Sequence, residues 1–103
     1  MTDTQTGTLP NIDGLIHEPA RLRVLALLSV LGQADFMYVL RQSGMSRGNL
    51  SVQMTKLEDA KIVSVTKQLA EGRPRTTYAL TAKGRAALQA YKQAMAQILE
   101  LLP

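Results

Sequence analysis

Residues 43–60 are the most informative segment for the fold of this chain. Their sequence is Ser-Gly-Met-Ser-Arg-Gly-Asn-Leu-Ser-Val-Gln-Met-Thr-Lys-Leu-Glu-Asp-Ala. The hydroxyl of Ser46 can cap a free backbone N–H, so we expect a helix to begin at Arg47. Leu50, Met54 and Leu57 follow at i, i+4 and i+7, which places three apolar side chains on one stripe of this helix. Its remaining surface carries basic, amide and hydroxyl groups, from Arg47, Asn49, Ser51, Gln53 and Lys56.

A polar surface of this composition suits a helix that reads DNA in the major groove. Arginine can donate to guanine, asparagine and glutamine can pair with adenine, and serine can reach bases or phosphates. The ordinary alternative is that every amphipathic surface helix has a polar face. The segments on either side of the helix therefore decide between the two interpretations.

Two further helices are predicted before this one. The segment 19–31 carries leucine and valine around most of its circumference, with Pro19 in the first turn and Gly32 as the stop, and is expected to be the central core helix. Asp35 can cap a short helix over residues 36–42. Two short helices joined by three residues that include glycine match the helix-turn-helix motif, whose second helix enters the major groove.

A basic β-hairpin is predicted after the helices. β-Branched residues in 62–68 and the run 76–80 indicate two strands, joined by a long loop at 69–74. At the tip of this hairpin Arg73 and Arg75 flank Pro74, which stiffens the backbone, so two guanidinium groups could reach phosphates or a neighbouring minor groove. The alternative is that an exposed hairpin tip is simply polar.

A long terminal helix is predicted over residues 82–102, with Thr81 as its cap. Its apolar residues are spaced 3, 4, 3 and 4 apart, as in the seam of a coiled coil. This spacing favours a homodimer interface, although the same stripe could pack on its own domain. The expected interface residues are Leu15, Ile16, Leu88, Tyr91, Met95, Ile98 and Leu102.

Composition excludes several other classes of protein. The 103 residues suit one domain, and 46% hydrophobic residues predict a folded core. Without cysteine and with one histidine, the chain offers no thiolate or multi-histidine metal site, and no cofactor is expected. No signal peptide or membrane-spanning run is visible, so a cytoplasmic location is expected. Six basic residues and one acidic residue between Lys61 and Arg85 form a local positive field that suits a polyanion.

In this order of elements the chain resembles the compact winged helix-turn-helix transcriptional regulators of the MarR/ArsR-like group. The segments that carry the resemblance are Leu15-Ile16-His17-Glu18-Pro19-Ala20-Arg21-Leu22-Arg23, Arg47-Gly48-Asn49-Leu50-Ser51 with Lys56-Leu57-Glu58, Gly72-Arg73-Pro74-Arg75-Thr76-Thr77-Tyr78, and Leu80-Thr81 with Lys83-Gly84. The resemblance implies a mainly α fold with a small β-hairpin, divided into an N-terminal flexible tail (1–14), a winged helix-turn-helix (15–81) and a C-terminal dimerisation helix (82–103). It also implies that residues 46–59 are the recognition helix and 63–80 the wing.

Three features depart from that group. Lys61 stands where a glycine usually ends the recognition helix, and a lysine in the left-handed conformation costs about 1 kcal/mol. Gln53 stands where histidine is more common, which affects base preference. The cysteine or histidine pairs of ArsR-like metal sensors are absent, so induction by a metal is not expected.

The predicted function is a sequence-specific, dimeric DNA-binding regulator, most simply a repressor, that acts on an inverted repeat and has no enzymatic activity. Residues expected to read base edges are Arg47, Asn49, Ser51 and Gln53, and those expected to hold the DNA backbone are Ser46, Lys56, Arg73 and Arg75. The alternative is a winged helix used as a protein-interaction module. A small-molecule effector could bind near Met37, Tyr38, Tyr91 and Met95, although an ordinary core role suits these residues better.

Overall fold

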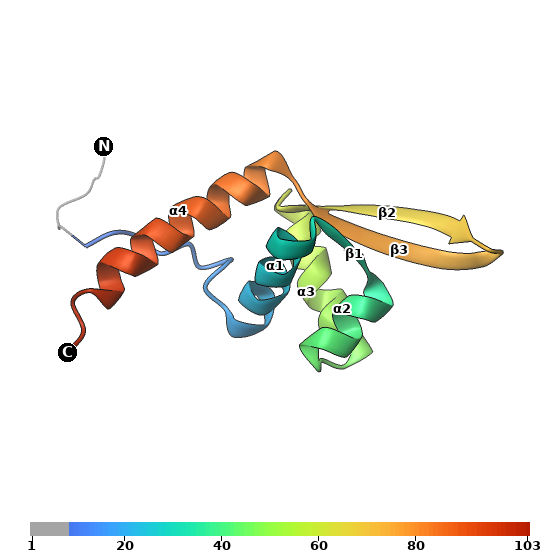
Figure 1. Ribbon diagram of the computed structural model, residues 1–103, viewed down its shortest axis with the longest axis horizontal. Helices are drawn as coiled ribbons and strands as arrows, with labels where there is room; N and C mark the ends of the chain where they lie inside the picture. The colour runs from blue at the N-terminus through green and yellow to red at the C-terminus, as the bar shows by residue number, and fades with distance from the viewer. Residues whose placement is uncertain (1–8) are drawn as a thin grey trace.

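Over residues 9–103, the computed structural model contains four α-helices and one three-stranded antiparallel sheet (Figure 1). The elements are α1 (Pro19–Leu31), β1 (Gln33–Asp35), α2 (Phe36–Ser43), α3 (Arg47–Asp59), β2 (Val63–Ala70), β3 (Arg73–Leu80) and α4 (Ala82–Leu99). The predicted fold class, a mainly α winged helix-turn-helix, is confirmed. Of the tail predicted over residues 1–14, residues 1–8 lie outside the described part of the chain, and in the rest Ile12 packs against the core.

The core lies around α1, as predicted. Val24, Leu25 and Leu28 of this helix are buried between α2, α3 and the sheet, whereas Leu31 is 44% exposed and is not a core residue. The predicted apolar stripe of α3 is also confirmed, since Leu50, Met54 and Leu57 are all buried. The opposite surface of α3 is thereby left to solvent.

The caps of the helix-turn-helix follow from its sequence. The carboxylate of Asp35 accepts a hydrogen bond from the N–H of Tyr38 (2.8 Å), and the hydroxyl of Ser46 accepts one from the N–H of Asn49 (3.1 Å). Gly44 ends α2 in the left-handed conformation, with φ 71°. These local signals start α3 at Arg47, where the sequence predicts it.

The wing differs from the prediction of a long loop. β2 and β3 pair as far as Ala70 and Arg73, so the hairpin closes over two residues, Glu71 and Gly72, with φ of 54° and 78°. A two-residue turn with positive φ at both positions matches the right-handed twist of the strands. Pro74 is tolerated because β1 pairs only with residues 77–79 of β3, so its missing N–H costs no ladder bond on that side.

The strand β1 was not predicted. It is three residues long, and it adds to the free edge of β3 with Ala34 opposite Tyr78. The sheet order is β1-β3-β2, so the root of the wing is three strands wide and its tip is two. The tip therefore projects from the body as a narrow ribbon (Figure 1).

The terminal helix is shorter than predicted. α4 ends at Leu99, and the N–H groups of Leu101 and Leu102 bond three residues back, at 3.0 and 3.1 Å, which tightens the chain out of α-helical geometry. Pro103 disfavours a helical conformation at Leu102. The long helix nevertheless extends away from the helix-turn-helix (Figure 1), and no helix within residues 9–103 is both long and apolar enough to cross a bilayer.

Candidate nucleic-acid interface

The exposed surface of α3 is built by helical periodicity. At about 100° per residue, the positions opposite the buried stripe are 48, 52, 55 and 59, flanked by 49 and 56. Asn49 and Lys56 are exposed at this surface, as predicted, and Arg47 and Ser51 are exposed on its other flank. The face that a groove would meet is thus neutral to basic over most of its length.

The set expected from sequence contains none of the four outward residues of α3, which are Gly48, Val52, Thr55 and Asp59. Val52 is 52% exposed and lies on the solvent side of the helix, although an apolar residue was not an obvious candidate for a polar face. Gly48 lies one turn earlier, and a Cβ built there would meet no atom within 4 Å. Glycine weakens a helix by about 0.5–1 kcal/mol relative to alanine, so internal packing does not explain its presence here.

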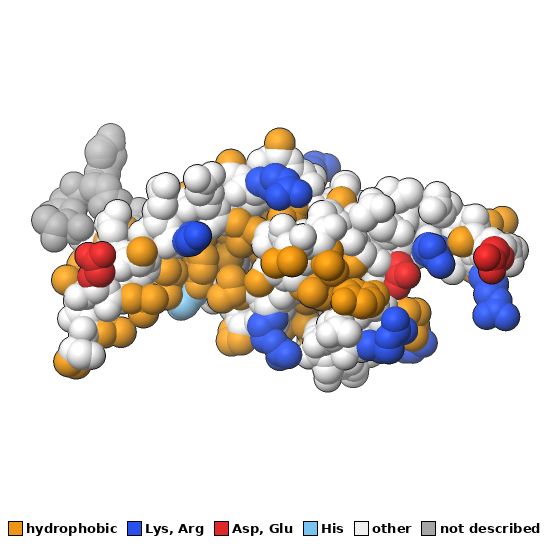
Figure 2. Space-filling model, in the orientation of Figure 1, with side chains coloured by type: hydrophobic (Ala, Val, Ile, Leu, Met, Phe, Trp, Pro, Cys, Tyr) orange, Lys and Arg blue, Asp and Glu red, His pale blue; other side chains and the backbone are white. Residues whose placement is uncertain are grey.

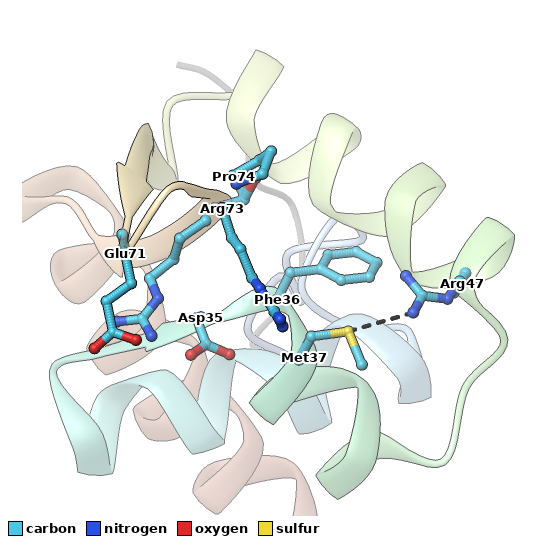
Figure 3. A pocket seen from close by; sticks show the side chains of 10 residues that line it. Asp35, Phe36, Met37, Arg47, Glu71, Arg73 and Pro74 are labelled. Atoms are coloured by element: carbon cyan, nitrogen blue, oxygen red, sulfur yellow. Dashed lines mark hydrogen bonds between the residues drawn. The ribbon is translucent and has the colours of Figure 1, made fainter.

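The wing and the start of α3 enclose a cleft of about 620 Å³. Arg47 reaches it from α3, and Arg73 and Arg75 reach it from β3, together with the acidic groups of Asp35 and Glu71 (Figure 3). A guanidinium nitrogen of Arg47 contacts the sulfur of Met37 at 3.5 Å, which directs this arginine along α2. The structure therefore brings together three of the predicted DNA-contacting arginines.

A second cleft, of about 350 Å³, separates the middle of α3 from the root of the wing. Ser51 and Thr55 line it from α3, and Lys67 lines it from β2. Burial, and secondarily the charge of Glu58, raises the pKa of the Tyr78 hydroxyl in this cleft above its ordinary value. Tyr78 is part of the hydrophobic core and acts as a packing residue.

Gln53 is placed differently from the other predicted base-reading residues. It is half-buried on the flank of α3, where its Oε1 accepts a hydrogen bond from the guanidinium of Arg21 (2.7 Å) and its Nε2 donates to Oδ1 of Asn49 (3.0 Å). Its amide is thus engaged within the protein on both sides. Arg21, which holds it, is a charged residue that is only 9% exposed.

Hydrophobic side chains form a continuous row on one part of the surface. In the face drawn in Figure 2, they gather along one side of α4, whereas Lys and Arg side chains are distributed over α4, the helix-turn-helix and the wing. Within residues 9–103, no group of three or more His, Asp or Glu side chains has a metal-binding arrangement. The surface is therefore equipped for contact with a polyanion at one end and with an apolar partner at the other.

The apolar end is a groove of about 780 Å³ between α1 and α4. Three of the predicted interface residues, Leu88, Tyr91 and Met95, line it, while Ile98 is half-buried nearby on α4 and Leu102 is exposed beyond the helix. Tyr91 forms the floor, since it is 8% exposed and its hydroxyl hydrogen-bonds Nδ1 of His17 at 2.9 Å.

Two of the residues expected at the dimer interface belong to the body of the domain. Ile16 is fully buried in the core of its own chain, so it has no surface to offer a partner and its assignment to an interface was wrong. Leu15 is half-buried against the same core. Both lie in the turn before α1, where the carboxylate of Asp13 accepts the N–H of Leu15 at 2.9 Å.

The residues suggested as an effector site do not converge. Met37 lies at the wing cleft, Tyr38 packs against the core from α2, and Tyr91 and Met95 lie in the α1–α4 groove. They cannot line one pocket within a single chain.

A helix-turn-helix with an exposed second helix, followed by an arginine-bearing β-hairpin, defines the winged-helix class of DNA-binding proteins. The chain belongs to the winged helix DNA-binding domain family, whose model matches residues 20–99. The predicted resemblance to winged-helix regulators is thereby confirmed. This is a family of DNA-binding domains and not of enzymes.

Individual relatives agree with this assignment. The chain is 32% identical over 77 residues to an uncharacterised protein of Methanocaldococcus jannaschii, covering 75% of this chain and 84% of that protein. Its structure resembles that of a transcriptional regulator homologue of Pyrococcus horikoshii, with a TM-score of 0.79, 23% identity and coverage of 84% and 85% of the two chains. It also resembles the transcriptional repressor CouR bound to a 23-mer DNA duplex, with a TM-score of 0.67, 28% identity and coverage of 76% of this chain and 54% of CouR.

Proposed function

We propose that this chain is a sequence-specific transcriptional regulator that acts as a homodimer on an inverted-repeat operator. The proposal rests on the arrangement of Arg47, Arg73 and Arg75, which come from the recognition helix and the wing and line one cleft. A helix that enters the major groove beside a ribbon that follows the adjacent backbone requires its basic groups on one side in this way.

The side chains of α3 have different roles in base recognition. Arg47, Asn49 and Ser51 are exposed and reach base edges, and Gln53 supports Asn49 from the flank. Val52 offers an apolar contact to the C5-methyl group of a thymine. Gly48 lets the wall of the groove approach the helix backbone, which explains a glycine with open space around it.

Contacts to the DNA backbone come from both ends of the interface. Ser46 stands at the N-terminus of α3, where backbone N–H groups favour a phosphate, and Lys56 stands at its C-terminal half. Arg73 and Arg75 extend the contact to the next groove from the two-stranded tip. These residues set affinity and its salt dependence, whereas the outward face of α3 sets sequence preference.

The second copy of the chain occupies the α1–α4 groove in this proposal. Leu22 of α1 and Leu88, Met95 and Leu99 of α4 line the groove, and Leu99 is 55% exposed in the single chain. Exposed leucines continue beyond α4, with Leu101 at 67% and Leu102 at 61%. An apolar surface of this kind beside a projecting helix supports a two-fold dimer, which would set half-sites about 10 bp apart or at a multiple of that distance.

Repression is the proposed outcome of binding. CouR, which is 28% identical and similar in structure, is named a transcriptional repressor and is bound to a DNA duplex. A dimer that covers both half-sites of an operator would exclude polymerase from the same DNA. Expression of a reporter gene placed behind the selected operator would rise on deletion of the regulator if the regulator is a repressor. Expression would fall if the regulator is an activator.

Selection from a pool of random-sequence duplexes tests the proposal. Full-length protein should enrich an inverted repeat. The logarithm of its affinity should fall linearly with the logarithm of salt concentration, with a slope that corresponds to several neutralised phosphates. A protein-interaction module would enrich no sequence and would bind duplex DNA weakly at every salt concentration. That result would indicate that the domain binds a protein partner and does not regulate transcription through DNA.

A further inference from the structure

A buried arginine controls the amide groups on the flank of the recognition helix. Arg21 lies in α1 and is 9% exposed. Its Nε donates to the carbonyl of Leu15 at 2.6 Å, and a terminal nitrogen donates to Oε1 of Gln53 at 2.7 Å. Since Leu15 holds one side of the guanidinium, the group is not free to turn away from Gln53.

The chemistry of arginine sets the direction of every bond in this chain of contacts. A guanidinium has five N–H donors and no acceptor, so Gln53 must turn its oxygen toward Arg21. The Nε2 group of Gln53 then faces Asn49, which must present Oδ1 to it, at the observed 3.0 Å. Reversing either amide would oppose donor to donor, and reversing Gln53 would also leave a buried guanidinium N–H without a partner, which is the costly case.

The groups of this hydrogen-bond network that remain unpaired are therefore N–H donors. Both amide oxygens already accept a bond from inside the protein. The Nδ2 group of Asn49 donates to no other group within residues 9–103, and the second hydrogen of Gln53 Nε2 is also unpaired there. Asparagine usually recognises adenine by using the oxygen and the nitrogen of one amide together. Here the Asn49 oxygen already accepts a bond from Gln53, which draws it toward the protein and leaves Nδ2 as the unpaired group of this amide.

We propose that Arg21 makes Asn49 and Gln53 a pair of hydrogen-bond donors, so that this part of α3 selects guanine, whose O6 and N7 are both acceptors, over adenine. Guanine offers two acceptors in the major groove, whereas adenine pairs its N7 acceptor with an N6 donor. Arg21 is a positioning residue in this assignment and does not contact DNA. The inference rests on the proposed function and specifies the base class that the same helix reads.

The test uses duplexes enriched from a random-sequence pool by the wild-type protein. The base opposite Asn49 is the position at which an Asn49→Ala variant loses its preference. We expect guanine there, and replacing it with 7-deazaguanine, which lacks the N7 acceptor, should lower wild-type affinity about tenfold. The same replacement should lower the affinity of Asn49→Ala less than that of the wild type, because that variant lacks the Asn49 donor.

A Gln53→Glu variant tests the role of Arg21. Glutamate keeps the length of the side chain and an oxygen for Arg21, but it cannot donate to Asn49, so the amide of Asn49 becomes free to reverse. The ratio of affinities for duplexes with guanine or adenine opposite Asn49 should fall about tenfold toward one. The added charge weakens both duplexes alike, so the ratio is insensitive to it. An unchanged ratio would overturn the proposal.

The outcomes separate this inference from the proposed function. Enrichment of adenine opposite Asn49, with affinity lost when its N6 amino group is removed, would overturn the inference and leave sequence-specific binding intact. An Asn49→Ala variant with an unchanged preference at every position would do the same. Failure to enrich any sequence would overturn the proposed function and this inference together. Asn49 is exposed, so its replacement by alanine should leave the fold intact, and the analogue affinities themselves are measured on the wild-type protein.

Discussion

Gly84, in the first turn of α4, lies so close to Ile62 that a Cβ on the glycine would overlap the Ile62 carbonyl oxygen. The same corner is closed by Thr81, whose hydroxyl donates to the carbonyl of Lys61 at 2.6 Å and accepts the N–H of Gly84 at 2.9 Å. The backbone N–H of Thr81 also bonds the Ile62 carbonyl at 3.0 Å. This corner therefore ties the start of α4 to the residues that follow the recognition helix.

Gly84→Ala should destabilise the fold by about 1–3 kcal/mol, because the new methyl group must displace backbone and not a flexible side chain. Urea denaturation followed by circular dichroism measures this loss. Gly48→Ala is the matched control, since Gly48 also lies in the first turn of a helix but has open space around it. Equal stability of the two variants would mean that α4 does not pack on Ile62 as described.

Lys61→Gly should stabilise the protein by about 1 kcal/mol. Lys61 has φ 65°, a left-handed conformation that a glycine adopts without a Cβ penalty. The N–H groups of Lys61 and Ile62 bond the carbonyls of Glu58 and Leu57, both at 2.9 Å, so the turn must keep this geometry. Thermal unfolding of Lys61→Gly beside Lys61→Ala checks the reason: the alanine variant removes the same charge and should bring no gain.

Local sequence signals predicted much of this fold. The caps at Asp35, Ser46 and Thr81 and the buried stripe of α3 depend on a few neighbouring residues, so they could be read directly. β1 could not, because a three-residue strand has no periodicity and exists through pairing with residues far along the chain. The same holds for the wing tip, where Pro74 suggested a loop and only the pairing of β2 with β3 extends the strands past it.

The residues of the candidate site were predicted from their chemical type. The errors in that prediction arise because residue type does not give the position of a residue around the helix. Val52 was passed over because it is apolar, although its angle on the helix places it outward. Gln53 was expected to face a base, yet its position on the flank brings it to Arg21. A charged residue on an apolar helix does not reveal a buried partner until the helices are packed, so the network from Arg21 to Asn49 could not be derived from sequence.

Gly48→Ala should raise stability and lower DNA affinity at once. Alanine favours the helix over glycine by about 0.5–1 kcal/mol, and its methyl group meets no atom of the protein. The same methyl group would stand between α3 and the wall of the major groove, which should weaken binding to the enriched duplex about tenfold. Thermal unfolding and fluorescence anisotropy on one preparation measure both effects. Higher stability with undiminished affinity would show that the outward face of α3 does not meet DNA closely.

Arg75→Ala and Arg47→Ala should affect binding in different ways. Loss of a wing guanidinium should weaken specific and random duplexes by similar factors and reduce the slope of log affinity against log salt by about one. Loss of Arg47 should weaken the specific duplex more, by about 1–3 kcal/mol, and relax preference at one position. Lys83→Gln, which removes the same charge from the start of α4, is the control and should change neither measure much. Identical losses for both arginine variants on both duplexes would contradict their separate roles.

Met95→Glu should dissociate the proposed dimer. Met95 is half-buried in the apolar groove between α1 and α4, and a carboxylate there would be removed from water by the second copy without a partner of opposite charge. Gln97→Glu adds the same charge to an exposed position of α4 outside the groove and should leave the dimer intact. Sedimentation equilibrium distinguishes the two.

Because a two-fold dimer holds two recognition helices on one DNA, the Met95 variant should bind the full inverted repeat no better than a single half-site. A wild-type protein that sediments as a monomer at all concentrations, yet prefers the full repeat, would mean that the two copies meet through DNA and not through this groove.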